Sequence, residues 1–176
     1  MKSYFLSGLL LSVLFLSCKD NKKTETENTE ATKPFTVTVN AIVEKDDIFQ
    51  IFYNEDGGDN FAPADAITIN VKGNAQPQDL VFQLPEDASP MALRFDIGGN
   101  KDLKQVPFKG FKIEYLGKKI ESNSAEFFKY FYGNAQVELD TVNTVAKIKA
   151  PVDGNYDPIL GSTVALKAAI EKLYKQ

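Results

Sequence analysis

The residue pair best suited to bind a ligand in this chain is Arg94 with Asp96. Arg94 is the only arginine among the 176 residues, and its planar guanidinium presents five N–H donors in a fixed fork. If residues 93–97 form a strand, alternation places Arg94 and Asp96 on one face and the apolar residues on the other. The pair can then hold a carboxylate or adjacent sugar hydroxyls, with Asp96 orienting the cation. The alternative interpretation is an ordinary structural ion pair.

Tyr53 is the third candidate ligand-binding residue, and an acidic loop follows it directly. This loop carries Glu55, Asp56 and Asp59 around two glycines. Calcium prefers six to eight oxygen ligands, and a glycine-rich loop lets several carboxylates and carbonyls converge. We therefore treat these three carboxylates as candidate metal ligands and calcium as the candidate cofactor. The residue order does not match an EF-hand loop, and a solvated turn between two strands is the alternative.

Several kinds of chemistry are excluded by composition. The chain has no histidine, no tryptophan and a single cysteine, which excludes Ser-His and Cys-His catalysis and histidine-based zinc sites. No glycine-rich phosphate loop opens a helix. A carboxylate pair can hydrolyse a glycosidic bond, but nothing in the spacing of the 24 acidic residues singles out two. The formal net charge of −4 argues against a nucleic-acid partner. We expect a protein that is not an enzyme.

From residue 35 onward, short apolar or alternating runs are separated by turn residues. This spacing is typical of an antiparallel β-sandwich. The predicted strands cover residues 35–39, 48–53, 66–71, 80–84, 91–97, 111–116, 137–142 and 144–150. The expected fold is mainly β and jelly-roll-like, with about eight strands in one domain, residues 35–176, because there is no internal repeat and no second linker.

Two helices are expected beside the strands. Asn123 can cap a short helix whose aromatic residues gather on one side, and at helical spacing these rings more often cover the core than stack on sugars. The closing segment has Ser162 as its predicted cap and a regular apolar face. The residues of that face are Leu166, Ile170, Leu173 and Tyr174.

The N-terminus has the layout of an export signal. A basic start at Lys2 leads into an apolar run over residues 4–16 that is too short to cross a bilayer. The tetrapeptide at residues 15–18 resembles a bacterial lipoprotein box. That resemblance implies a signal peptide at residues 1–17 and acyl chains, palmitate among them, on Cys18. It also implies a membrane partner and an outer-membrane lipoprotein of the cell envelope, periplasmic or surface-exposed. The alternative is an ordinary signal peptide that leaves Cys18 as a free thiol.

Residues 18–34 contain the predicted lipid site and the segment that follows it. This segment is rich in Lys, Glu, Thr and Asn and has no large apolar side chain. Such a composition cannot bury enough apolar area to offset its chain entropy, which predicts a disordered tether.

The order of motifs in the domain resembles a known family. The runs at residues 90–98, 108–115 and 129–134 are similar to non-catalytic jelly-roll sandwiches of Bacteroidetes envelope lipoproteins, which resemble carbohydrate-binding accessory domains. The resemblance covers about residues 35–158 and implies a non-enzymatic module that binds a glycan or glycoconjugate. The absence of tryptophan departs from the usual sugar-stacking pattern. Two alternatives stay open: a protein-interaction accessory subunit of an envelope complex, and a carboxylate-based glycosidase.

Overall fold

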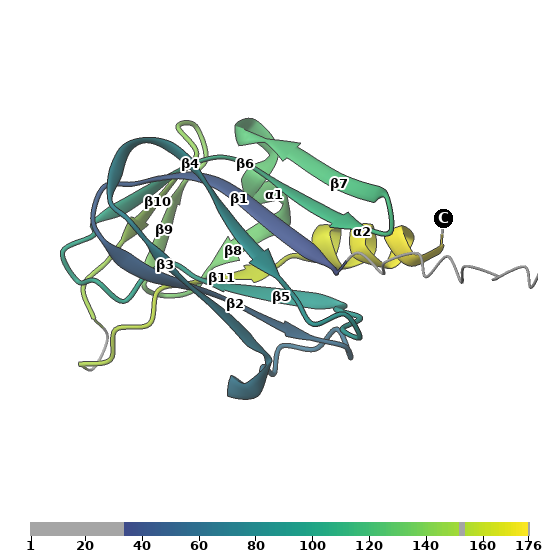
Figure 1. Ribbon diagram of the computed structural model, residues 1–176. Coiled ribbons are helices and arrows are strands. Elements are labelled where there is room, and N and C mark those ends of the chain that lie inside the picture. Colours follow the sequence, from purple (N-terminus) through teal and green to yellow (C-terminus); the bar gives the residue numbers. More distant parts are fainter. Residues whose placement is uncertain (1–33, 152–153, 176) are drawn as a thin grey trace, which may run out of the picture. The chain divides into compact units, whose positions relative to one another are not determined.

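The computed structural model describes residues 34–151 and 154–175. The predicted signal peptide, the lipid site at Cys18 and all of the predicted tether except Pro34 lie outside these residues. The described residues form eleven strands in two sheets, and every pairing of strands is antiparallel. The two sheets are seen one above the other in Figure 1.

The first sheet has six strands. In order it contains β4 (Asn74–Gln83), β1 (Thr36–Val43), β6 (Gln105–Tyr115), β10 (Val145–Ile148) and β9 (Val137–Asp140), with β7 (Lys118–Asn123) paired to β6. The second sheet has five strands. In order it contains β3 (Ala66–Val71), β2 (Asp47–Asn54), β5 (Ala92–Asp96), β11 (Ile159–Ser162) and β8 (Phe131–Gly133). A 3-10 turn, η1 (Pro63–Asp65), precedes β3.

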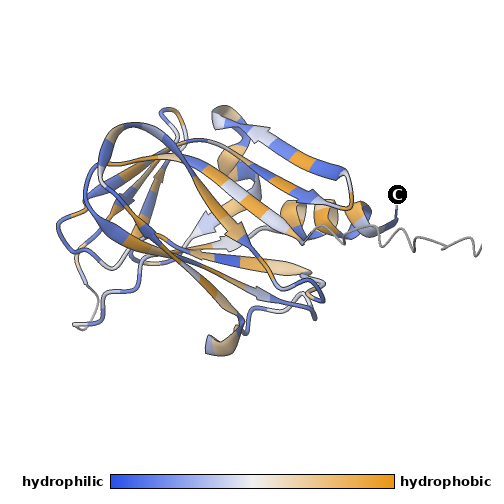
Figure 2. Ribbon diagram, viewed as in Figure 1, coloured by the Kyte–Doolittle hydropathy of each residue, from blue (hydrophilic) through white to orange (hydrophobic). Residues whose placement is uncertain are grey.

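The core lies between the sheets because each strand alternates apolar and polar residues. Along β1 every second residue is buried, and Figure 2 shows hydrophobic and hydrophilic positions alternating along the strands. Three phenylalanines join the two layers: Phe95 of the second sheet lies 5.7 Å from Phe82 and 6.2 Å from Phe108, ring centroid to centroid, in edge-to-face contacts. These contacts fix the inner face of β5, so its other face must point outward.

The predicted fold class is confirmed: the protein is a mainly β, antiparallel sandwich with a C-terminal helix. All eight predicted strands are present. Three further strands, β7, β8 and β11, raise the number to eleven in the described residues. They escaped prediction because β7 is mostly polar and the other two span only three and four residues, so local periodicity gives no signal.

The predicted aromatic helix is confirmed as part of the core. It consists of η2 (Ser124–Glu126) followed by α1 (Phe127–Tyr130), and the Asn123 side chain accepts a hydrogen bond from the N–H of Glu126 at 3.2 Å. Phe127 and Phe131 are wholly buried and stack at 5.1 Å. These rings therefore cover the core.

The C-terminal helix, α2 (Val164–Lys175), packs beside β7 and α1 and buries Leu166, Ile170 and Leu173. The prediction that Ser162 caps this helix is wrong. Ser162 ends β11, where its buried hydroxyl accepts from the N–H of Leu93 at 2.7 Å and donates to its carbonyl at 2.6 Å. Thr163 is the cap instead, since its hydroxyl accepts from the N–H of Leu166 at 3.4 Å.

Among residues 34–151 and 154–175, no helix combines the length and the hydrophobicity needed to span a bilayer.

Candidate functional site

Arg94 lies on β5, the central strand of the second sheet, and points to the outer face. Its neighbours on the strand, Leu93 and Phe95, are wholly buried, so alternation turns Arg94 outward. Cross-strand pairing aligns Arg94 with Phe52 of β2 on one side and with Gly161 of β11 on the other. Gly161 in turn pairs with Tyr132 of β8. We call this line across the sheet, Phe52, Arg94, Gly161 and Tyr132, the Arg94 row.

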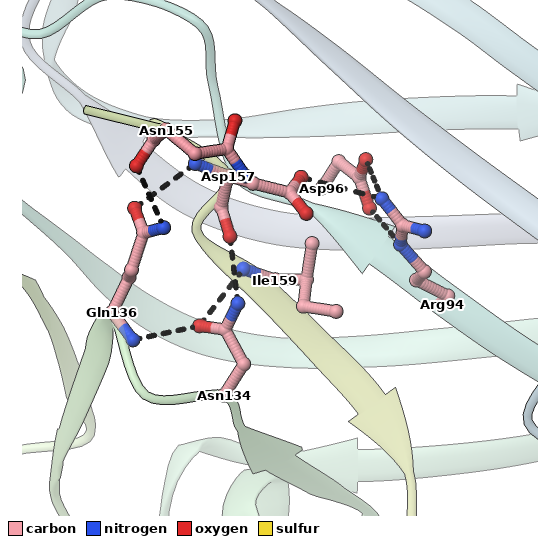
Figure 3. A network of polar contacts seen from close by, with 7 residues as sticks. All are labelled: Arg94, Asp96, Asn134, Gln136, Asn155, Asp157 and Ile159. Carbon is pink, nitrogen blue, oxygen red and sulfur yellow. Dashed lines mark hydrogen bonds and ion pairs between the residues drawn. The ribbon is translucent and has the colours of Figure 1, made fainter. Parts of the chain in front are cut away.

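Two carboxylates hold the guanidinium of Arg94. Its Nε donates to Oδ1 of Asp96 at 2.8 Å and its Nη2 to Oδ2 at 2.7 Å, a bidentate pair within one strand. Nη2 also reaches Oδ1 of Asp157 at 3.3 Å. The exposed fractions of the side chains are 24% for Arg94, 17% for Asp96 and 43% for Asp157. Figure 3 shows the third guanidinium nitrogen, Nη1, pointing away from both carboxylates, and it makes no hydrogen bond to a described residue.

Burial raises the pKa of Asp96 above its ordinary value, and the nearby charge of Asp157 raises it further. The two hydrogen bonds and the positive charge of Arg94 act in the opposite direction. Burial is the largest of these effects. It raises the pKa because the charged form of a carboxyl loses hydration inside the protein. With both carboxylates ionised, the group of Arg94, Asp96 and Asp157 carries a net charge of −1.

Aromatic rings occupy both ends of the Arg94 row. The Cζ atom of Arg94 lies 4.7 Å from the centroid of the Phe52 ring, a cation–π contact. On the other side, the Tyr132 ring lies over Gly161: a Cβ atom built on Gly161 would come within 2.5 Å of Cζ of Tyr132. Any side chain at Gly161 would push the Tyr132 ring aside. Tyr132 remains 45% exposed, so much of this ring is open to solvent.

The backbone of Asp157 is fixed by two amide side chains from the segment between β8 and β9. Asn134 donates its Nδ2 to the carbonyl of Asp157 at 2.6 Å, and Oε1 of Gln136 accepts from the N–H of Asp157 at 2.9 Å. Nε2 of Gln136 also donates to the carbonyl of Asn155 at 3.0 Å. These contacts, drawn in Figure 3, hold the Asp157 carboxylate beside Arg94.

The structure does not bring Tyr53 to this row. Tyr53 follows Phe52 on β2, and successive side chains of a strand point to opposite faces, so it packs partly against the core. Burial, followed by the charges of Asp65 and Glu55, raises the pKa of Tyr53. Tyr53 lines a shallow hollow of about 470 Å³ together with Asn54, Glu55, Asp56 and Asp65.

The three candidate metal ligands point to separate partners. Glu55 accepts from the N–H of Ser89 at 2.7 Å, Asp56 from the N–H of Gly58 at 2.8 Å, and Asp59 pairs with Lys167 at 3.0 Å. In the part of the chain that the structure describes, no group of three or more acidic or cysteine side chains is placed to hold a metal ion. The calcium hypothesis thus has no assembled set of acidic ligands there.

The loop owes its shape to Asn54, the residue directly before the acidic run. Its Nδ2 donates to the carbonyls of Gly58 and Asn60 at 3.0 and 2.9 Å, and its Oδ1 accepts from the N–H of Gly57 at 3.1 Å. A single buried amide therefore closes the loop on itself.

Comparison with protein-family models, curated proteins and solved structures finds no match to this chain.

Proposed function

We propose that this chain is a lipid-anchored, non-enzymatic module of the cell envelope that binds a glycan or glycoconjugate on the outer face of its second sheet. The observation that carries the proposal is the Arg94 row. It places a guanidinium with one uncommitted nitrogen between two aromatic side chains on an open sheet. The anchor part of the proposal rests on the lipoprotein-like box ending at Cys18.

The dimensions of the row suit an extended polar ligand. Phe52 and Tyr132 stand on strands three positions apart in the sheet, which corresponds to about 14 Å at the usual strand spacing. The exposed Tyr132 ring can stack on the C–H face of a sugar, and Nη1 of Arg94 can donate to a hydroxyl. Apolar contact through flat rings combined with a few fixed polar groups is the usual composition of a small-molecule site.

The glycosidase alternative has less support from the same geometry. A raised pKa is a property of general acids, and Asp96 has one, but both of its oxygens accept N–H groups from Arg94. A general acid must carry a proton that it can give to the leaving-group oxygen. The bidentate pair favours the ionised, hydrogen-bond-accepting form of Asp96 instead.

The protein-docking alternative also lacks a specific surface. Phe127 of the aromatic helix is wholly buried, and Phe128 and Tyr130 pack partly against the core. Large exposed apolar side chains in the described residues are distributed over separate elements rather than gathered in one patch. They are Ile48, Val81, Leu116, Tyr132, Val142 and Val164.

A glycan-array screen of the full chain in detergent tests the proposal. We expect wild type to bind and Tyr132→Ala to weaken binding about tenfold, the equivalent of one aromatic contact of roughly 1.4 kcal/mol. Val81→Ala is the matched control, because Val81 is equally exposed (45%) but lies on the other sheet. A blank array, or equal binding by the Tyr132 and Val81 variants, would contradict the proposal.

A further inference from the structure

The outer face of the second sheet carries few charges. Outward-pointing residues of β2 and β3 are apolar or uncharged; Gln50 and Thr68, for example, are joined by a hydrogen bond of 2.8 Å. On β5 the outward charges are Arg94 and Asp96, and Asp157 lies just before β11. The cation is thus outnumbered on its own face, and the local net charge is −1 when both carboxylates are ionised.

The hydrogen-bonding capacity left over in this group is of two kinds. Nη1 of Arg94 is a donor without a partner among the described residues, and Oδ2 of Asp157 is an acceptor without one. The Asp157 side chain is 43% exposed, so a ligand can reach it. This group therefore leaves one donor and one acceptor open to a ligand, and the donor, Nη1, points away from the two carboxylates (Figure 3).

We infer that the ligand of this face is a neutral, hydroxyl-rich glycan and not an acidic one. The inference rests on the proposed function and adds the ligand class to it. A hydroxyl both donates and accepts, so separate hydroxyls of one oligosaccharide can accept from Nη1 of Arg94 and donate to Asp157.

An acidic sugar fits the same atoms poorly. Its carboxylate or sulfate can accept from Nη1, but it has no proton to give to Asp157 and is repelled by that like charge. Asp96 already occupies the bidentate edge of the guanidinium, which is the edge that recognises a carboxylate best. Arg94 alone would suggest an anionic ligand, and its two partners reverse that expectation.

The test compares paired oligosaccharides of the same length and linkage, one neutral and one carrying uronic acids or sulfate, by titration into the full chain in detergent. Wild type should bind the neutral member at least tenfold more tightly. Asp157→Asn should lower that ratio about tenfold, because it weakens the contact to the hydroxyl and removes the repulsion of the anion. Asp87→Asn, which makes the same change of charge at an exposed position between β4 and β5, should leave the ratio unchanged.

The outcomes separate the two proposals. Tighter binding of the acidic member, or the same ratio in the Asp157 and Asp87 variants, overturns the inference while glycan binding itself stands. Binding of neither member, with the array also blank, overturns the proposed function and the inference together. The melting temperature of Asp157→Asn, measured alongside, shows that the variant is folded.

Discussion

The carboxylate of Asp47 accepts the backbone N–H of Gly99 at 2.8 Å, linking the start of β2 to the turn after β5. The same oxygen, Oδ1, also accepts from the N–H of Asn100 at 3.0 Å. Gly98, before them, has a φ of +97°, and a Cβ atom there would come within 2.3 Å of the other Asp47 oxygen. Asp47 thus holds a turn that only glycine can form.

We predict that Asp47→Ala destabilises the fold by roughly 1–3 kcal/mol, because three backbone N–H groups, those of Ile48, Gly99 and Asn100, lose a carboxylate acceptor. The melting temperature should fall by several degrees. Asp102→Ala is the control, since Asp102 is exposed in the following turn and its carboxylate accepts no hydrogen bond from a described residue. Equal melting temperatures for the two variants would show that the Asp47 contacts contribute nothing.

A methyl group at position 161 should disturb the Arg94 row. Gly161→Ala would place Cβ within 2.5 Å of the Tyr132 ring, so the exposed ring must move and stability should drop by about 1 kcal/mol, the lower end of the usual cost of overpacking. In the double variant Gly161→Ala/Tyr132→Ala the clash is absent, and the cost of the Gly161 change should largely disappear. Denaturant unfolding of all four proteins gives the coupling, and additive effects would refute the contact.

Removing Arg94 should cost more stability at neutral than at acid pH. Arg94→Met leaves the carboxylate of Asp96, only 17% exposed, without its cation, at a cost of roughly 2–3 kcal/mol near neutrality. The pKa of Asp96 is already raised by burial and would rise further. A carboxyl with a raised folded-state pKa contributes stability below its unfolded pKa and loses it as pH rises through the folded value.

The check is the difference in melting temperature between Arg94→Met and wild type, measured at about pH 4 and pH 7. Adding Asp96→Asn should remove most of the pH dependence of that difference. A loss that is the same at both values of pH would mean that Asp96 does not stay charged against Arg94.

The contribution of Asp140 to stability should have the opposite pH dependence to that of Asp96. Hydrogen bonds from the side chain and backbone N–H of Asn143, together with Lys147, lower the pKa of Asp140 from 3.8 to about 2. The stability from this group is therefore fully present above pH 3.8 and is lost as pH falls through about 2. Asp140→Asn should flatten the fall in melting temperature between those values, whereas Asp102→Asn should not. If the melting temperatures of wild type and Asp140→Asn fell equally as the pH was lowered, this prediction would be wrong.

The predicted anchor gives a test that does not depend on the sandwich. Cys18→Ala should move the protein from the membrane fraction to the soluble fraction after fractionation of the producing cells, because the acyl chains are the predicted attachment. Ser17→Ala, the neighbouring change, should leave the protein in the membrane fraction. Unchanged membrane association of Cys18→Ala would disprove the anchor.

Alternation alone was enough to predict which residues of β5 face the core. The period of two in residues 93–97 correctly put Phe95 inside and Arg94 with Asp96 outside. The helix cap at Asn123 could also be predicted from the sequence, because capping depends on residues three positions apart. Such local patterns account for eight of the eleven strands in the described residues, for the short helix and for Arg94 with Asp96 in the candidate site.

The rest of the candidate site depends on register, which no local pattern encodes. Asp157 lies 63 positions from Arg94, and Phe52 and Tyr132 join the row only through cross-strand pairing. Phe52 and Tyr53 are adjacent and both aromatic, so composition could not show which of them faces Arg94. The cap of α2 moved by one residue for a similar reason, since tertiary contact with Leu93 occupies the hydroxyl of Ser162.

The position of β11 also sets the order in which the molecule can be assembled. This strand, near the C-terminus, lies between β5 and β8 in the second sheet. Until residues 159–162 have been synthesised, β5 and β8 lack a common neighbour and the sheet cannot close. The second sheet is therefore completed only when residues 159–162 join strands that lie much earlier in the sequence. Because β8 pairs in this sheet with β11 alone, its place in the fold depends on this late interior strand.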